Sequence, residues 1–150
     1  MSKFIHPIAG TLATLLVASF WLSTVIVEAF GTHAQIAVVK LAIPWGFLLL
    51  VPALAATGGT GLIRARGHRG GIVERKLRRM PIIAANGVLV LIPSALFLAW
   101  KAGAGAFDTA FYAVQAVELV AGAANFTLLA LNMRDGLRMT RRLPRSAKSR

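Results

Sequence analysis

The sequence predicts an all-α integral membrane protein in which four transmembrane helices form a single bundle. Composition is the first reason: 57% of the 150 residues are hydrophobic and the mean hydropathy is +0.69, whereas soluble domains are usually about 45–50% apolar. The second reason is segregation, because nearly all of the 17 Lys and Arg residues lie outside four long apolar runs. The chain has no Cys, which excludes disulfides, thiolate nucleophiles and Cys-ligated metals.

Each apolar run is close to the ~20 residues that a helix needs to cross a ~30 Å hydrocarbon core. Helices are expected because a helix satisfies its own backbone N–H and C=O groups in lipid. The predicted spans cover residues 7–27, 36–56, 82–100 and 109–131. We expect one domain over residues 1–139, with a basic, Gly-rich loop at 57–81, followed by a basic tail at 140–150.

The distribution of Lys and Arg predicts the orientation of the spans. The loop at 57–81 and the tail are rich in Arg, whereas the connection at 28–35 has no Lys or Arg and the last connection has only Lys101. Because basic loops stay in the cytoplasm, both termini and the long loop are expected there, in a bacterial-type inner (plasma) membrane. Trp21 and Trp100 are then expected at the outer interface.

The same basic segments bear on binding partners. The formal charge of +12 would suggest nucleic acid in a soluble protein. Here the basic residues flank apolar spans, so anionic lipid headgroups are the expected counter-charge and nucleic acid is not an expected partner.

The fourth span carries its polar residues on one helical face. They recur at steps of three or four residues, or at their sum, and a similar stripe in the third span contains Asn86. The stripe of the fourth span contains Gln115, Glu118, Gly122, Asn125 and Asn132. We therefore expect a bundle around a partly polar interior, with Asn86, Asn125 and Asn132 inside it.

Lys40 and Glu118 are the charged residues expected deepest in the membrane. A lone charge at the bilayer centre costs at least ~2.5–3.5 kcal/mol, so the two side chains are predicted to pair. Two interpretations of this pair stay open. It can be a structural ion pair that fixes helix register, or Glu118 can be part of a proton or cation relay.

Short matches between the two halves of the chain indicate an internal repeat. Residues 29–32 (Ala-Phe-Gly-Thr) resemble 106–109 (Ala-Phe-Asp-Thr), and 6–8 (His-Pro-Ile) resemble 80–82 (Met-Pro-Ile). Since both halves run in the same direction, the repeat would be parallel, relating the first two spans to the last two about an axis along the membrane normal.

The repeat leads to a cofactor hypothesis. It makes His6 and Met80 equivalent at the cytoplasmic end, and His with Met is a known axial pair for haem iron. A haem b held between the first and third spans would then have Arg79 and Arg134 near its propionates. The alternative is that His6 is a helix-start residue and Met80 is simply the first apolar residue of its span.

No catalytic group or metal site is predicted. The serines within the spans have no His or acid at a spacing that would activate them. The sequence therefore favours a small polytopic inner-membrane protein that is a non-catalytic accessory or assembly subunit, with a membrane-protein partner or a second copy of itself. The alternatives are a haem-binding electron-transfer protein using His6 and a proton-coupled small transporter using Glu118.

Overall fold

The computed structural model of the protein describes residues 2–65 and 71–141. This part of the chain is helical apart from two connections and contains no strand. Its elements are α1 (Ser2–Phe30), α2 (His33–Ala65), α3 (Gly71–Asn86), the π-helical turn η1 (Gly87–Leu91), α4 (Ile92–Gly103) and α5 (Thr109–Arg141). The predicted all-helical class is confirmed.

Four stretches of these helices are long and apolar enough to cross a membrane, as predicted. They are Pro7–Phe30, His33–Gly61, Arg78–Gly103 and Thr109–Gly136. The helices extend beyond the expected spans. In particular, most of the segment expected as a Gly-rich loop at 57–81 is helical, since α2 continues to Ala65 and α3 begins at Gly71. Glycine lowers helix propensity by only ~1 kcal/mol relative to alanine, which a long, packed helix tolerates.

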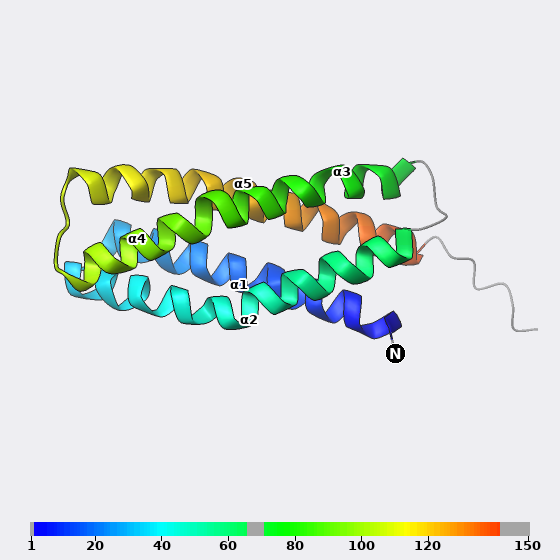
Figure 1. Cartoon of the computed structure of the whole chain (residues 1–150), viewed down its shortest axis with the longest axis horizontal. Coiled ribbons are helices and arrows are strands. Elements are labelled where there is room, and N and C mark those ends of the chain that lie inside the picture. The colour runs from blue at the N-terminus through cyan, green and yellow to red at the C-terminus, as the bar shows by residue number, and fades with distance from the viewer. Residues whose placement is uncertain (1, 66–70, 142–150) are drawn as a thin grey trace, which may run out of the picture.

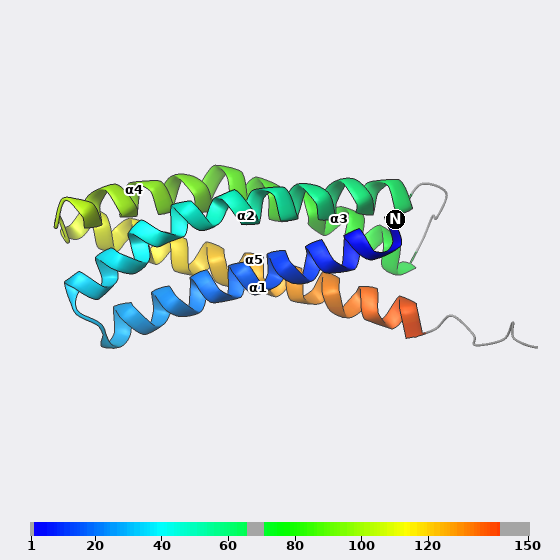
Figure 2. The same cartoon turned by 90° about the horizontal axis from the view of Figure 1, so that it is seen from below.

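The helices form an antiparallel bundle (Figures 1 and 2). α3, η1 and α4 follow one another as a continuous rod, so the bundle has four rods. Going round it, α1 packs on α2, α2 on the α3–α4 rod, this rod on α5, and α5 on α1. Among the described residues, α2 and α5 have no close backbone approach and therefore lie diagonally opposite. The start of α1, the end of α2, the start of α3 and the end of α5 lie at one end of the bundle.

Local sequence signals fix both described connections. Thr32 caps α2 in a capping box with Gln35: the backbone N–H of Thr32 donates to Gln35 Oε1 at 2.8 Å, and Gln35 N–H donates to Thr32 Oγ1 at 3.4 Å. At the other connection, α4 ends in a Schellman motif. The N–H of Ala106 donates to the carbonyl of Lys101 at 2.9 Å, and Gly105 takes the left-handed conformation, φ +66°, that the motif requires.

The π-helical turn has a proline next to it. Pro93 has no N–H for the carbonyl of Leu89, and its ring would collide with that carbonyl in a regular α-helix. In η1 the chain takes a wider turn, in which the N–H of Ile92 donates to the carbonyl of Gly87, five residues back. The wider turn relieves the clash, and it occurs directly after Asn86, one of the polar residues expected inside the bundle.

Two glycines let consecutive aromatic side chains of α1 pack closely against both neighbouring helices. Phe20 lies over Gly46 of α2, where a Cβ atom would collide with its ring. Trp21 lies over Gly122 of α5, where a Cβ atom would come within 2.8 Å of the indole Cδ1. Gly122 therefore allows the close approach that small residues provide between membrane helices.

Candidate functional site

The centre of the candidate site is an ion pair across the bundle. Lys40 Nζ of α2 contacts Glu118 Oε2 of α5, and the Lys40 side chain is 0% exposed. Because α2 and α5 are diagonal, the two side chains meet in the interior rather than at an interface between neighbouring helices. The structure thus brings together the two residues that the sequence analysis pairs.

Other polar groups surround this pair. Gln115 Nε2, one turn away on α5, donates to Glu118 Oε2 at 3.3 Å, while its own Oε1 is buried and has no protein partner. Glu28 of α1 lies within electrostatic range of both Lys40 and Glu118, and its Oε1 is likewise buried without a partner. The site therefore holds two carboxyl groups and one ammonium group. Buried polar atoms of this kind are normally satisfied.

The asparagines expected inside the bundle connect α3 to α5. Asn86 Nδ2 donates to Asn125 Oδ1 at 3.1 Å and to the carbonyl of Ala121 at 2.9 Å, and Asn125 Nδ2 donates to the carbonyl of Ile83 at 3.4 Å. This network lies between the Lys40–Glu118 pair and the end of the bundle that carries the termini. Interhelical hydrogen bonds of this type stabilise membrane bundles modestly, by about 0.6 kcal/mol each on average.

A second ion pair lies nearer to that end. Arg79 of α3 and Asp135 of α5 are joined at 2.9 Å, and Arg134 Nε lies 4.0 Å from the same carboxylate. Asn132 Nδ2 donates to Met80 Sδ at 3.5 Å. Met80 also packs against the apolar cluster that includes Ala53, Ile83 and Leu129.

These contacts give no support to a haem site at this end. The Met80 sulfur accepts a hydrogen bond from Asn132 and lies within the core, and the Arg79 guanidinium forms an ion pair with Asp135. The side chain of His6 lies outside the described part of the chain. Among the described residues there is also no cluster of three His, Cys, Asp or Glu side chains that could hold a metal ion.

A long cavity of about 500 Å³ occupies the interior of the bundle. Its walls are formed by residues 17–24 of α1, 43–59 of α2, 83–95 of the α3–α4 rod and 118–125 of α5, and they are mainly aliphatic and aromatic. Thr24 and Glu118 lie at one end, and Gly58 and Gly59 at the other. Ala55 and Val88 line it and are also exposed on the outside, so the cavity opens between α2 and the α3–α4 rod.

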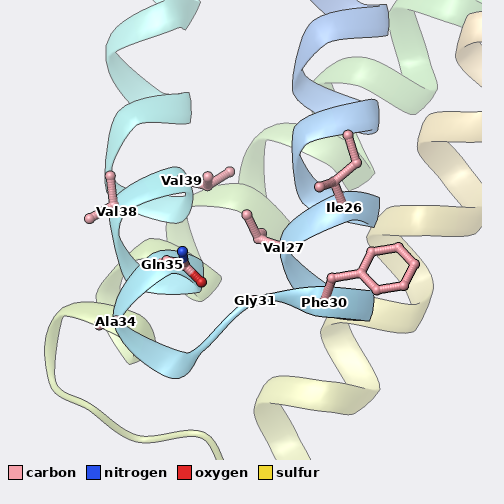
Figure 3. A pocket seen from close by; sticks show the side chains of 8 residues that line it. All are labelled: Ile26, Val27, Phe30, Gly31, Ala34, Gln35, Val38 and Val39. Atoms are coloured by element: carbon pink, nitrogen blue, oxygen red, sulfur yellow. The ribbon is translucent and has the colours of Figure 1, made fainter.

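A second, shallower pocket lies where α1 turns into α2 (Figure 3). Val27 and Val39 point into the space between the two helices, and the ring of Phe30 turns away from α2. Its one polar side chain, Gln35, is already engaged in capping α2. The pocket is thus a surface feature of the turn.

Sequence reasoning missed the interior position of two residues, Asp135 and Trp21. Asp135 follows Asn132 by three positions and so continues the polar stripe of α5, which is the signal that would have found it. Trp21 was expected at the outer interface, but its Nε1 donates to the carbonyl of Leu119 at 3.0 Å inside the bundle.

No protein-family model, curated protein or solved structure matches the chain.

Proposed function

We propose that the protein is a plasma-membrane protein with both termini in the cytoplasm, which serves as a non-catalytic accessory or assembly subunit and whose polar interior is structural. The observation that carries the proposal is the pairing of interior charges across helices, Lys40 with Glu118 and Arg79 with Asp135. Each pair ties together helices that are distant in sequence. This is the arrangement expected of polar groups that fix register, rather than of groups kept free for chemistry.

The cytoplasmic orientation is supported by the fold and the charge pattern together. Basic residues gather in the first half of α3 and in the last turns of α5, and both of these segments belong to the end of the bundle where α1 begins. With these segments in the cytoplasm, their side chains meet anionic headgroups. Two antiparallel hairpins, α1–α2 and α3–α5, are also compatible with the parallel internal repeat.

A role beside another membrane protein is supported by the outer face of α5. Small side chains recur there at steps of three or four residues on either side of Val120, and all are exposed. They are Ala113, Ala116, Ala124 and Thr127. Membrane helices associate through faces of this kind, because small residues let backbones approach and gain van der Waals contact.

The test is the assembly state of the protein extracted from its native membrane in a mild detergent, measured by native mass spectrometry. We expect a complex of fixed stoichiometry, which Ala116→Leu with Ala124→Leu dissociates. Ala42→Leu with Ala85→Leu, on exposed positions of α2 and α3, is the matched control and should leave the complex intact. A monomer from native membranes, with no cross-linked partner before extraction, would reject the accessory role.

A second candidate, a proton-coupled transporter of a small lipophilic molecule, is favoured by one observation: the interior cavity reaches Glu118. Carboxyl groups within membrane spans are common proton carriers in transporters. In proteoliposomes, such a transporter would lose proton movement on Glu118→Gln. A structural pair predicts no substrate-dependent proton movement in the wild-type protein.

A further inference from the structure

The interior cavity has one polar end, and the protein satisfies only part of it. Thr24 is 2% exposed and lines the cavity, yet among the described residues its hydroxyl has no hydrogen-bond partner. At the same end, Glu118 Oε2 receives both Lys40 and Gln115, which leaves Oε1 as an acceptor. Thr24 and Glu118 thus line the same end of the cavity.

The remaining walls are apolar except for Asn125, whose amide is already hydrogen-bonded to Asn86 and to the carbonyl of Ile83, and the space is long. On α2 the lining runs from Ile43 to Gly59, which at ~1.5 Å of rise per residue corresponds to ~24 Å of helix. Pockets for small molecules are typically ~300–1,000 Å³, mainly apolar, with a few polar groups that fix orientation. A volume of about 500 Å³ spread over this length suits a single extended chain.

The charge at the polar end selects for a neutral ligand. Lys40 and Glu118 compensate each other, and Glu28, the other carboxyl group of the site, does not line the cavity. A cationic or anionic headgroup would therefore meet no uncompensated charge on the cavity wall beside Thr24. The opening between α2 and the α3–α4 rod lies on the lipid-facing side of the bundle. A ligand can therefore enter from the hydrocarbon phase.

We propose that this cavity binds a neutral, single-chain lipophilic molecule from the membrane, whose terminal hydroxyl hydrogen-bonds to Thr24 Oγ1 and Glu118 Oε1 while its chain extends towards Gly58. The proposal depends only on the bundle lying in a membrane. It holds whether the protein is an accessory subunit or a transporter. Its failure would leave the accessory role standing, whereas it would remove the support that the cavity gives to a lipophilic transport substrate.

Trp21 lines the cavity and provides the readout. The other tryptophans, Trp45 and Trp100, are 75% and 66% exposed and do not line it. The detergent-purified protein with Trp45→Phe and Trp100→Phe is titrated with dodecanol brominated on the carbon beside the alcohol carbon. Bromine quenches indole fluorescence on contact. The control is a variant in which Trp45 is the only tryptophan, because Trp45 reports quenching by brominated dodecanol dissolved in the detergent micelle.

Saturable quenching of Trp21, reversed by unbrominated dodecanol, is the expected result, with only gradual, unsaturated quenching of Trp45. Thr24→Val keeps the shape of the side chain and should weaken binding of the alcohol roughly three- to tenfold, as loss of one hydrogen bond implies. It should leave unchanged the binding of dodecane brominated at the corresponding carbon. This difference distinguishes a site that recognises the hydroxyl group from one that binds any apolar chain.

Substitutions that fill the cavity with a larger side chain provide a second test. Gly58→Leu and Gly59→Leu place a side chain at the far end, where a Cβ atom on Gly59 would meet nothing within 4 Å and one on Gly58 only Met80 Cε at 4.0 Å. Either should abolish saturable quenching, while the lipid-facing control Ala42→Leu retains it. Three results would overturn the proposal. They are quenching of Trp21 that does not saturate, an equal effect of Thr24→Val on the binding of the alcohol and of the alkane, and saturable quenching by chain-brominated phosphatidylcholine alone.

Discussion

Lys40 and Glu118 meet in the middle of the bundle from helices whose backbones do not approach each other closely, so their ion pair joins the two hairpins across the diagonal. Lys40 is one of the largest fully buried side chains of the described residues, and its charge is compensated within the protein rather than by headgroups. Removing either residue of the pair would leave the charge of the other buried and unpaired in a low-dielectric interior. The pair therefore makes the position of α2 depend on that of α5.

The orientation of the spans can be tested with single cysteines, because the chain has none of its own. Thr32→Cys lies in the α1–α2 turn and Ser146→Cys lies in the basic tail. In intact cells, a membrane-impermeant maleimide should label the first within minutes, and the second only after permeabilisation. Labelling with the opposite order would invert the topology, and equal labelling of both would contradict a four-span arrangement.

Gly122 is expected to be intolerant of any side chain because of Trp21. The Cβ atom of Gly122→Ala would lie 2.8 Å from Trp21 Cδ1, and overpacking of this kind typically costs ~1–3 kcal/mol. The free energy of unfolding in mixed SDS micelles measures the loss. Gly59→Ala is the control, since its Cβ atom is unobstructed and the change should be neutral or stabilising by up to ~1 kcal/mol.

A second background separates the clash from a general effect of helix stiffening. If the indole is the cause, Gly122→Ala should cost much less in a Trp21→Leu protein. The same cost in both backgrounds would show that Gly122 is needed for another reason.

Protonation of Asp108 is expected to lower the free energy of unfolding at acid pH. Its carboxylate bonds to Lys101 Nζ at 2.5 Å and caps α5 by accepting the N–H of Phe111 at 3.0 Å. The bond from Lys101, and then that from Phe111, hold the pKa of Asp108 below its ordinary value. The unfolded chain consequently binds the proton more tightly. The stabilisation is complete above the unfolded pKa of about 3.9 and is lost as pH falls through the lower, folded pKa.

The measurement for Asp108 is the unfolding free energy of wild type and Asp108→Asn as a function of pH. Asparagine keeps a capping oxygen but cannot ionise, so the stability difference between the two proteins should shrink as the solution is acidified below about pH 4. A difference that stays constant across this range would mean that ionisation of Asp108 contributes nothing.

The helical class and the spans could be read from the sequence because bilayer thickness imposes run length directly. The position at which α2 ends could not be read from the sequence. Gly58, Gly59 and Gly61 are ordinary turn residues in solution, but here they lie in a helix that packs along α1, with Gly10 of α1 beside Thr57. Tertiary packing outweighed local propensity, and the expected loop became helix.

The same contrast applies to the candidate site. Lys40 and Glu118 could be paired beforehand, because an isolated charge in a membrane span needs a partner. The cavity could not be foreseen. It depends on how Trp21, Phe47, Ile83 and Leu50 fill the space between the helices, and on the wider turn of η1 before Pro93, none of which the pattern of apolar residues specifies.

The structural role of the Lys40–Glu118 pair can be tested directly by a double-mutant cycle on the free energy of unfolding. Lys40→Met and Glu118→Met should each cost about 3–5 kcal/mol, and the double variant should recover most of that loss. The exposed pair of Glu74 and Arg78 on α3 is the control, with an expected coupling of about 0.3–0.5 kcal/mol. Additive losses at Lys40 and Glu118, with no recovery in the double variant, would contradict a structural role for the pair.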